Sequence, residues 1–312
     1  MMKLFKKHRC FGLIMARPFL KWAGGKTQLL PALIESLPPR PEDGYQYAEA
    51  FLGGGALFFE LENRGWIKSA TLNDANPELI LCYKTIRDSL APVLVELRKI
   101  EDSFPKNLEL QSDFFYQARE EWNSEICESV DFYPKKRVVR RVALTIFLNK
   151  TCYNGLFRVN RKGEFNTPFG KYENPKICDE PNLRSVSEAL QSVQLLCGDY
   201  SELNNQVTPF DLIYFDPPYR PLTTSSSFTA YSRSGFNDKN QKELAEFVTT
   251  ISESETNILL SNSDPKVEDP EDEFFDDLYE GFVIKRILAS RTINSKGNRR
   301  GKITEILVSN YN

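Results

Sequence analysis

The chain is poor in histidine, paired cysteines and long apolar runs. His8 is the only histidine in 312 residues, which excludes a Ser-His-Asp triad, a Cys-His pair and zinc chemistry of the H-E-x-x-H type. The six cysteines form no C-x-x-C pair, so we expect free thiols, a reducing cytoplasm and no metal. No apolar stretch approaches the ~20 residues that a bilayer-spanning helix needs, so we expect a soluble protein without a membrane partner. Any reaction must rely on carboxylates, lysines, tyrosines or an activated cosubstrate.

The net charge of −3 gives no sign of a nucleic-acid partner, but the distribution of charge does. Residues 135–171 are rich in lysine and arginine and contain one acidic residue, Glu164, while 285–302 are basic and contain none. Basic zones in an otherwise acidic chain are expected where a protein contacts phosphates. The alternative for each zone is an ordinary solvated surface.

The motif Asp216-Pro217-Pro218-Tyr219 combines an anion, a rigid carbonyl and an aromatic face. It follows the apolar run 210–215, which is typical of a buried parallel strand that ends at the ligand crevice of an α/β sheet. The prolines fix φ and lack N–H groups, so the turn is stiff and its carbonyls are free to accept hydrogen bonds. An exocyclic amine of a flat base could bond to the Asp216 carboxylate and the Pro217 carbonyl while Tyr219 stacks on the ring. An ordinary strand-to-loop turn is the alternative.

A glycine-rich turn between a predicted strand, 46–50, and a predicted helix, 56–64, indicates a nucleotide-like ligand. Glycine backbone and a free helix N-terminus allow close approach. Asp74 lies at the end of the next predicted strand, 70–72, where doubly wound folds bind ribose hydroxyls. The pattern is not G-x-G-x-x-G, which favours an adenosine ligand over a dinucleotide. Residues 24–27, Gly-Gly-Lys-Thr, lack the earlier glycine of a phosphate loop.

The order of the predicted elements indicates one α/β sheet with an insertion. Further strands are predicted at 193–197, 210–215, 257–260, 282–287 and 303–308. Between the two groups of strands, helical spacing recurs at 79–86, 94–104 and 135–150. Residues 156–170 then indicate a β-hairpin with a basic tip that suits a DNA groove. We expect residues 15–76 and 193–312 to form a catalytic domain and residues 77–192 to form an inserted, mainly helical recognition domain.

Several ordered segments resemble the Dam-type DNA adenine-N6 methyltransferases. They are FLKWAGGK (19–26), EAFLGGGALFFE (49–60), LNKTCYNGLFRVNRKGEFNTPFGKY (148–172), DPPY (216–219) and FTAYSRSGF (228–236), with SNSD (261–264) and RTINSKGNRR (291–300) in addition. The match extends from about Ala16 to Tyr311, and the order of the segments is that of the alpha class. The resemblance implies a Rossmann-like methyltransferase that uses S-adenosylmethionine and modifies N6 of adenine in duplex DNA, in GATC or a longer site such as GATATC.

The resemblance also implies roles for individual residues. Positions that hold S-adenosylmethionine are matched by Trp22, Lys26, Asp74 and Asp216, with Phe51, Gly53 and Gly55 around its amino-acid part and Asp199 near its adenine. Positions that meet the DNA site are matched by Lys21, Tyr153, Asn154, Leu156, Arg158 and Pro168. The basic zone adds Arg140, Arg161, Lys162 and Lys171 as further DNA-binding residues. The expected catalytic residues are Asp216, Pro217 and Tyr219.

The implied chemistry needs no metal and no imidazole base, because a sulfonium is already an excellent leaving group. The target base must first be flipped out of the duplex. We expect a cytoplasmic monomer that acts on duplex DNA, with a cognate restriction endonuclease as a possible further partner. Cytosine-N4, RNA and protein-glutamine methyltransferases share the glycine turn and the proline motif. A catalytically inactive DNA-binding regulator is an alternative of another class.

The first fourteen residues precede the region of resemblance. They are basic, include the only histidine, and are followed by Met15, a second plausible start. We expect residues 1–14 to be a mobile basic arm or an upstream-start extension, with the folded enzyme beginning near Met15.

Overall fold

The computed structural model describes residues 14–124, 135–206, 209–220, 236–290 and 302–312. Three features of the sequence lie outside these ranges: the basic leader up to residue 13, residues 228–235 of one matched segment, and the basic segment 291–300. The expectations for them therefore stay predictions.

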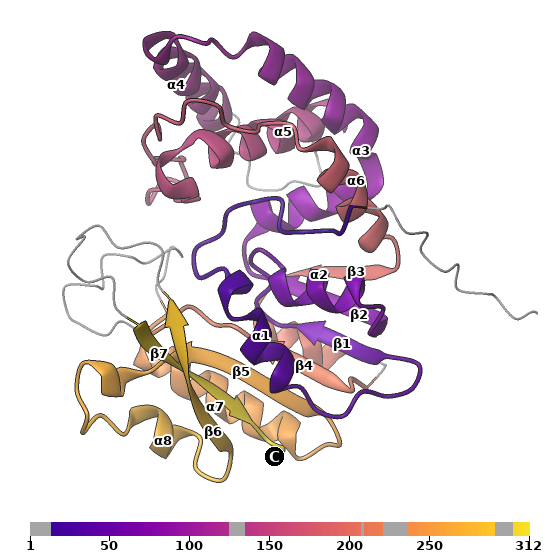
Figure 1. Cartoon of the computed structure of the whole chain (residues 1–312), viewed down its shortest axis with the longest axis vertical. Helices are drawn as coiled ribbons and strands as arrows, with labels where there is room; N and C mark the ends of the chain where they lie inside the picture. The colour runs from indigo at the N-terminus through magenta and orange to yellow at the C-terminus, as the bar shows by residue number, and fades with distance from the viewer. Residues whose placement is uncertain (1–13, 125–134, 207–208, 221–235, 291–301) are drawn as a thin grey trace, which may run out of the picture.

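The centre of the fold is a seven-stranded sheet with the strand order β3-β2-β1-β4-β5-β7-β6 (Figure 1). The strands from β1 to β5 pair in parallel, whereas β7 is antiparallel to both of its neighbours, β5 and β6. All seven predicted strands are present, with ends shifted by a few residues, and the predicted Rossmann-like α/β class is confirmed. The bounds are β1 (Tyr45–Glu49), β2 (Ile67–Asp74), β3 (Val193–Cys197), β4 (Leu212–Phe215), β5 (Asn257–Ser263), β6 (Val283–Ser290) and β7 (Lys302–Ser309).

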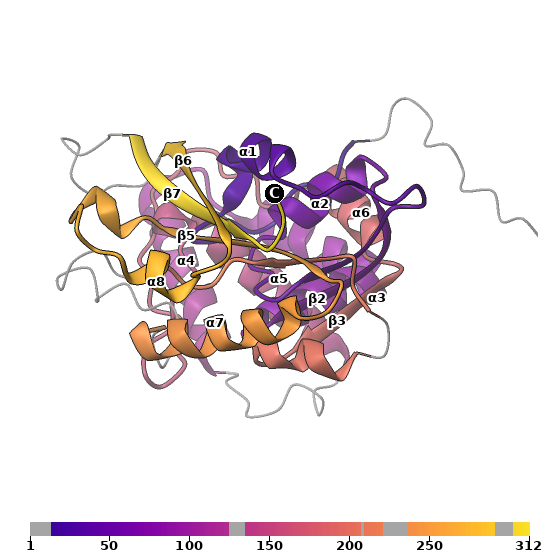
Figure 2. The same cartoon turned by 90° about the horizontal axis from the view of Figure 1, so that it is seen from below.

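Helices cover both faces of the sheet (Figure 2). On one face lie α1 (Leu30–Glu35) and α2 (Ala56–Asn63), and on the other lies α7 (Asp238–Ser252). Side chains alternate along β4, so Leu212 and Tyr214 belong to the core under α2, while Ile213 and Phe215 belong to the core under α7. A strand buried on both faces must be apolar throughout, which explains why this run was recognisable in the sequence.

A group of helices from the middle of the chain extends from one end of the sheet (Figure 1). It consists of α3 (Pro77–Ser103), α4 (Leu108–Ser124), α5 (Lys135–Thr151) and α6 (Glu180–Ala189). Asn76 caps α3 by accepting hydrogen bonds from the N–H groups of Glu78 and Leu79. Ser89 has a non-helical φ of −148°, because Pro92 in the next turn has no N–H to donate. The helix is kinked there, and α3 contacts β2 and β3 as well as α5 and α6. None of the described helices is long and apolar enough to cross a membrane.

Candidate active site

The predicted motif Asp216-Pro217-Pro218-Tyr219 follows β4 at the point where the strand order reverses direction in the sheet. Ser261 of the neighbouring strand β5 donates a hydrogen bond of 3.1 Å to Oδ1 of Asp216. The ammonium of Lys26 lies 2.6 Å from the same oxygen. Lys26 is buried and also donates to the carbonyl of Gly24 at 2.8 Å. Three segments far apart in the sequence therefore meet at one carboxylate.

The carboxylate of Asp216 has one occupied oxygen and one available oxygen. Both contacts described above involve Oδ1, and no donor among the described residues reaches Oδ2 or the Pro217 carbonyl. Burial raises the pKa of Asp216, while the ammonium of Lys26 and the Ser261 hydroxyl lower it. The lysine therefore favours the ionised carboxylate. Two oxygen acceptors remain for a ligand with two N–H groups.

Tyr219 is held at both its ring and its hydroxyl. The ammonium of Lys26 lies 4.5 Å from the ring centroid, and the hydroxyl donates to Glu305 of β7. Burial, with the negative charges of Asp216 and Glu305, raises the pKa of Tyr219 well above its ordinary value. The hydroxyl therefore stays protonated and able to donate at neutral pH.

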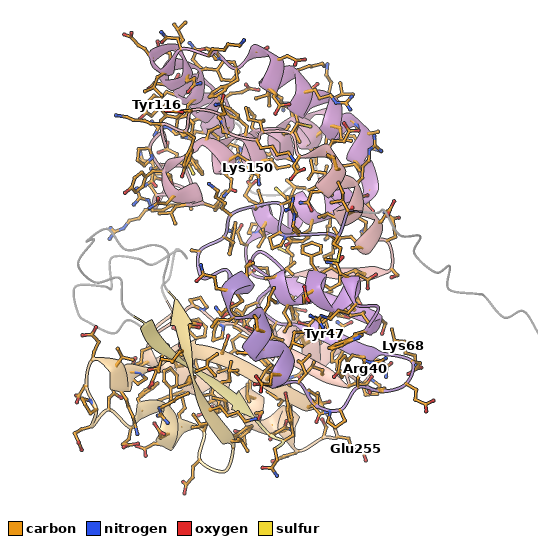
Figure 3. The ribbon with its side chains drawn as sticks, in the orientation of Figure 1. Arg40, Tyr47, Lys68, Tyr116, Lys150 and Glu255 are labelled. Atoms are coloured by element: carbon orange, nitrogen blue, oxygen red, sulfur yellow. The ribbon has the colours of Figure 1, made fainter. Side chains whose placement is uncertain are left out.

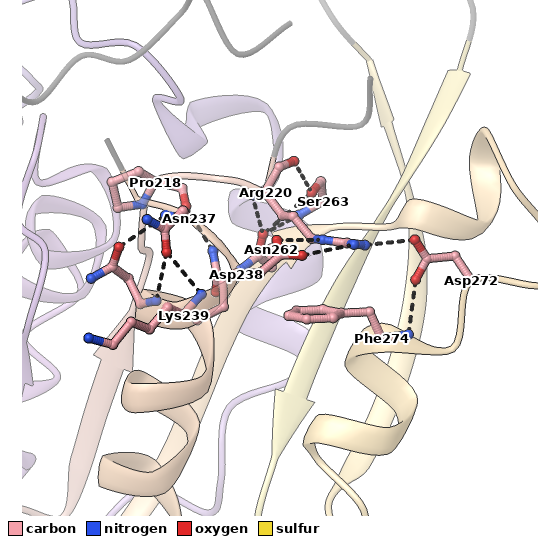
Figure 4. Close-up of polar contacts among 11 residues, drawn as sticks. Pro218, Arg220, Asn237, Asp238, Lys239, Asn262, Ser263, Asp272 and Phe274 are labelled. Atoms are coloured by element: carbon pink, nitrogen blue, oxygen red, sulfur yellow. Dashed lines mark hydrogen bonds and ion pairs between the residues drawn. The ribbon is translucent and has the colours of Figure 1, made fainter. Parts of the chain in front are cut away.

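The backbone after the motif is fixed by a buried network of side chains (Figure 4). Gln241 of α7 donates to the Pro218 carbonyl at 3.1 Å, and Asn262 of β5 accepts from the Arg220 N–H at 3.4 Å. Asn262 also donates to the amide oxygen of Gln241 at 3.1 Å. Both amide side chains are completely buried, so they have no water with which to exchange these bonds. The path of the chain on either side of Tyr219 is thereby determined.

The guanidinium of Arg220 ties the same stretch to two further elements (Figure 4). It lies 2.9 Å from Asp238 at the start of α7 and 2.6 Å from Asp272, which precedes α8 (Phe274–Leu278). The ring of Phe274 lies 4.1 Å from the guanidinium carbon. Ser263 donates to the Arg220 carbonyl at 3.1 Å. These contacts support the motif from the side of α7 and α8.

The glycine turn after β1 is closed by Asp74 at the end of β2. Its carboxylate accepts from the N–H groups of Gly53 at 2.9 Å and Asn76 at 2.8 Å, and these bonds oppose the rise in its pKa that burial causes. Gly53 has a φ of +49°, and a Cβ there would lie 2.9 Å from the ring of Trp22. Gly55, with a φ of +67°, begins α2. The structure thus brings together four predicted ligand-binding residues: Trp22, Gly53, Gly55 and Asp74.

Aromatic rings flank the glycine turn on the side of β3. The ring of Phe51 lies 5.7 Å from that of Tyr200 and 6.0 Å from that of Phe236. Asp199 caps the turn that begins at Tyr200, and its carbonyl accepts from Asn73 of β2 at 3.3 Å. The buried Oδ1 of Asn73 has no partner among the described residues. Glycine backbone, carboxylates and aromatic rings together suit an adenosine-containing ligand.

Glu49 is a buried carboxyl group beneath this turn. It accepts hydrogen bonds of 2.7 Å from the hydroxyl of Tyr47 and from the N–H of Phe58, which joins β1 to α2. Burial raises the pKa of Glu49 to about 8, although both hydrogen bonds lower it. Glu49 is therefore mainly protonated at neutral pH. Tyr47 itself lies within the sheet (Figure 3).

The predicted DNA contacts at the end of α5 form a tight turn. Tyr153 is half exposed, and Asn154 has a left-handed φ of +57°. The N–H of Tyr153 donates to the Pro168 carbonyl at 2.8 Å, and the carbonyl of Leu156 accepts from Thr167 at 2.7 Å. The turn is therefore supported through its backbone, which leaves the side chain of Tyr153 facing solvent.

Asn149, buried in α5, joins this turn to the segment that carries Lys21. Its side chain donates to the carbonyls of Lys21 at 2.8 Å and Gly155 at 2.9 Å, and accepts from the Lys21 N–H at 2.8 Å. The Lys21 ammonium lies 4.5 Å from the ring of Tyr172. Burial, with Lys21 among the nearby cations, lowers the pKa of Lys150 on the same helix (Figure 3). Lys21 is thus placed beside the predicted recognition turn.

The predicted β-hairpin at 156–170 is a loop with isolated bridges, and the prediction of two strands is wrong. One antiparallel bridge joins Val159 to Phe165. The N–H of Asn166 still donates to the Arg158 carbonyl at 3.0 Å, but beyond it the Leu156 carbonyl accepts from the Thr167 side chain at 2.7 Å, and Pro168 has no N–H to donate. Leu156, at the start of this loop, is partly buried, whereas the other predicted DNA contacts in and after the loop are exposed: Arg158, Arg161, Lys162, Pro168 and Lys171.

The basic zone 135–171 was expected to be a surface that contacts phosphates. The structure shows that part of it is not. Arg141 is buried, with its guanidinium 2.7 Å from Glu78 and 3.4 Å from the Trp122 ring. Arg140, a predicted DNA contact, forms two hydrogen bonds of 2.7 Å to Glu121 and so links α5 to α4. Two of these arginines therefore have structural partners. In the second zone, Arg286 of β6 likewise pairs with Asp276 at 2.6 Å.

Several residues of the site were not predicted to be functional. Ser261 and Asn262 lie in the SNSD segment and Asn149 in the segment 148–172, so the resemblance contained a signal for them. Gln241 and Glu305 had none, because they reach the motif only through the packing of α7 and the pairing of β7. The described residues contain no group of three or more His, Cys, Asp or Glu side chains that could hold a metal ion.

Comparison with known proteins identifies close relatives along nearly the whole chain. The profile of the D12 class N6 adenine-specific DNA methyltransferases matches residues 22–293. The type II methyltransferase M.MjaIII of Methanocaldococcus jannaschii is 44% identical over 299 residues, covering 95% of this chain and 99% of that protein. The type II methyltransferase M1.LlaDCHI of Lactococcus lactis subsp. cremoris is 37% identical, with 99% of each chain covered. The DNA adenine methylase of Escherichia coli (strain K12) is 32% identical, with 93% of this chain and 94% of that protein covered.

Proposed function

The chain belongs to the D12 class of N6 adenine-specific DNA methyltransferases, and from this premise we propose that it transfers a methyl group from S-adenosylmethionine to a flipped-out adenine in GATC or a longer related site. Methylation of adenine in DNA follows from the family itself. The observation that carries the rest of the proposal is the pair of available acceptors, Oδ2 of Asp216 and the Pro217 carbonyl, beside the ring of Tyr219.

The two acceptors suit the two N–H groups of adenine N6. The lone pair of this amine is delocalised into the ring, so hydrogen bonds that pull the amine towards a tetrahedral geometry make it a better nucleophile. Lys26 keeps Asp216 ionised through Oδ1, so that Oδ2 can stabilise positive charge developing on N6. Tyr219 supplies a face on which the extrahelical base stacks.

S-adenosylmethionine supplies an activated methyl group on a positively charged sulfur, so the protein has only to bind and orient it. We assign its amino-acid part to the turn of Phe51, Gly53 and Gly55. Both glycines have positive φ, which other residues rarely adopt, and neither places a side chain between the backbone and a ligand. The remaining contacts are assigned to Trp22, Lys26, Asp74, Asp199 and Asp216, all of which lie at the carboxyl ends of the parallel strands or beside them.

Duplex DNA is assigned to the side of the recognition turn. The following residues there would read the site or contact phosphates: Lys21, Tyr153, Asn154, Leu156, Arg158, Arg161, Lys162, Pro168 and Lys171. Arg140 is not included, because its guanidinium is bound to Glu121. Residues 77–192 would form the recognition domain and 15–76 with 193–312 the catalytic domain, in a cytoplasmic monomer. The type II methyltransferases among the relatives make a cognate restriction endonuclease a reasonable partner to look for.

The proposal is tested by methyl transfer to defined duplexes. Purified protein and S-adenosylmethionine carrying a labelled methyl group are incubated with duplexes containing GATC, GATATC or a scrambled site, and the labelled nucleosides are identified after digestion. We expect N6-methyladenine from the GATC duplex and none from the scrambled one. Label in N4-methylcytosine, or equal label in all three duplexes, would contradict the proposal.

A further inference from the structure

We propose that Glu305 is a positioning residue for the methyl transfer: its hydrogen bond with the Tyr219 hydroxyl holds the ring where a flipped adenine stacks on it. Glu305 would act through the Tyr219 hydroxyl and would not touch substrate. The inference rests on the stacking role proposed for Tyr219. It assigns a function to the antiparallel strand β7, which contains none of the predicted site residues.

The position of Glu305 is rigid. β7 is an interior strand, and Glu305 pairs with Ser263 of β5 on one side and Ile287 of β6 on the other. Glu305 is buried, with 8% of its surface exposed. The paired backbone and the burial of the side chain leave this carboxylate little room to move, so the hydrogen bond limits the ring instead.

Tyr219 needs this restraint because its backbone alone does not define the position of its ring. The buried amides of Gln241 and Asn262 fix the chain beside Tyr219, but rotation about the side-chain bonds remains. The hydroxyl oxygen lies at the end of the side chain farthest from the backbone, so a hydrogen bond there restrains rotation about the Cα–Cβ bond, which would swing the ring away. The acceptor is a carboxylate, and charge-assisted hydrogen bonds are stronger than neutral ones.

A role in packing alone would not favour a carboxylate at this place. Burying an ionised group costs free energy, and an apolar side chain of similar volume would fill the same space in the sheet. The carboxylate lies one hydrogen bond from Tyr219, whose ring in turn contacts Lys26, the partner of Asp216. Glu305 therefore belongs to the chain of contacts that defines the reacting geometry.

The experiment is a double-mutant cycle between Glu305 and Tyr219. Glu305→Leu and Tyr219→Phe each remove the hydrogen bond from one side, the double variant removes both partners, and Glu305→Gln keeps a neutral acceptor. The measurements are the single-turnover methylation rate constant, the fluorescence of 2-aminopurine at the target position, the Kd for the duplex, and the thermal midpoint.

We expect Glu305→Leu and Tyr219→Phe each to lower the rate constant by roughly ten-fold, as for the loss of a hydrogen bond to a charged group. The 2-aminopurine signal should fall with the rate, while the Kd changes little. The double variant should be no slower than either single variant, and Glu305→Gln should recover most of the rate.

Three results would overturn the inference. Multiplied losses in the double variant would mean that Glu305 acts independently of Tyr219. A Glu305→Gln variant as slow as Glu305→Leu, with a changed pH–rate profile, would indicate proton transfer instead. An unchanged rate and fluorescence in Tyr219→Phe would show that the hydroxyl is not needed, even if Glu305→Leu failed to fold. The proposed stacking itself fails separately, if Tyr219→Ala leaves the 2-aminopurine signal unchanged.

Discussion

The catalytic motif and the recognition turn are held in opposite ways. Around Asp216 and Tyr219, buried side chains from several elements bind the polar groups of the motif itself. Around Tyr153 and Arg158, mainly backbone bonds support the turn, and the side chains remain exposed. The difference follows from the two tasks. Catalysis gains from groups that are already in place, whereas reading DNA requires side-chain donors that remain exposed and can reach the bases.

Substitution of Asp216, in the catalytic motif, should have the largest effect. Asp216→Ala removes an acceptor of the amine and the partner of Lys26, and we expect methyl transfer to fall by more than about a hundred-fold. Asp216→Asn keeps one acceptor oxygen and should lose less. Asp113→Ala, the same change at an exposed position of α4, serves as the control. A retained rate in Asp216→Ala, with an unchanged thermal midpoint, would contradict the assignment.

Glu49 tests whether a buried group near the catalytic motif also affects the stability of the protein. The pKa of Glu49 is about 8 in the folded chain and close to its ordinary 4.5 when unfolded. Between these values the folded state keeps a proton that the unfolded state has lost, so stability falls as pH rises. Glu49→Gln keeps the acceptor oxygen for Tyr47 and Phe58 but does not titrate.

We therefore expect the stability of Glu49→Gln relative to wild type to rise between about pH 5 and pH 8, by up to ~1.4 kcal/mol per pH unit. Denaturant unfolding at several pH values measures it directly. Parallel curves for the two proteins across this range would show that Glu49 does not titrate as described.

Arg158 tests the role of the exposed side chains around the recognition turn. Among the residues that the structure describes, Asn166 alone binds its guanidinium, at Nε and one terminal nitrogen, which leaves donors for a base edge. Arg158→Ala should reduce discrimination at one guanine by ~1–3 kcal/mol, measured as the ratio of kcat/KM on cognate and single-base variant duplexes. Arg184→Ala on the exposed side of α6 is the matched control. An equal loss on every duplex would indicate a phosphate contact instead.

Arg161 and Arg140 should separate surface charge from structural charge. Arg161→Ala should weaken all duplexes similarly and reduce the salt dependence of binding by about one unit of slope. Arg140→Ala should leave the slope unchanged and reduce stability by up to ~1 kcal/mol, because Arg140 is paired with Glu121. Titrations at several salt concentrations decide between these outcomes. A lower slope for Arg140→Ala would restore it as a DNA contact.

Much of the fold could be predicted because its signals are local. β4 is a short apolar run bounded by a rigid turn, and the glycines after β1 mark a sharp change of direction. The same local reasoning placed Asp74 at the end of a strand, where it holds Gly53. Each of these features depends on residues that are neighbours in the sequence.

The remaining features depend on tertiary neighbours. Glu305 reaches Tyr219 because β7 is inserted between β5 and β6, an order that no local pattern specifies. Arg141 was expected at a basic surface, yet Glu78 and Trp122 bury it between helices. The two strands predicted at 156–170 do not form, because side-chain hydrogen bonds and Pro168, which has no N–H to donate, interrupt the backbone pairing.

The reversed strand β7 also has a consequence for how the protein folds. β6 and β7 are successive strands and can pair early, but Glu305 meets Tyr219 only when the pair docks on β5. The reactive centre joins groups from position 26 to position 305, and contacts of such long sequence separation form slowly. Recovery of methyl transfer after refolding should therefore lag behind the return of helical signal, which makes the enzyme's own activity a reporter of its last folding step.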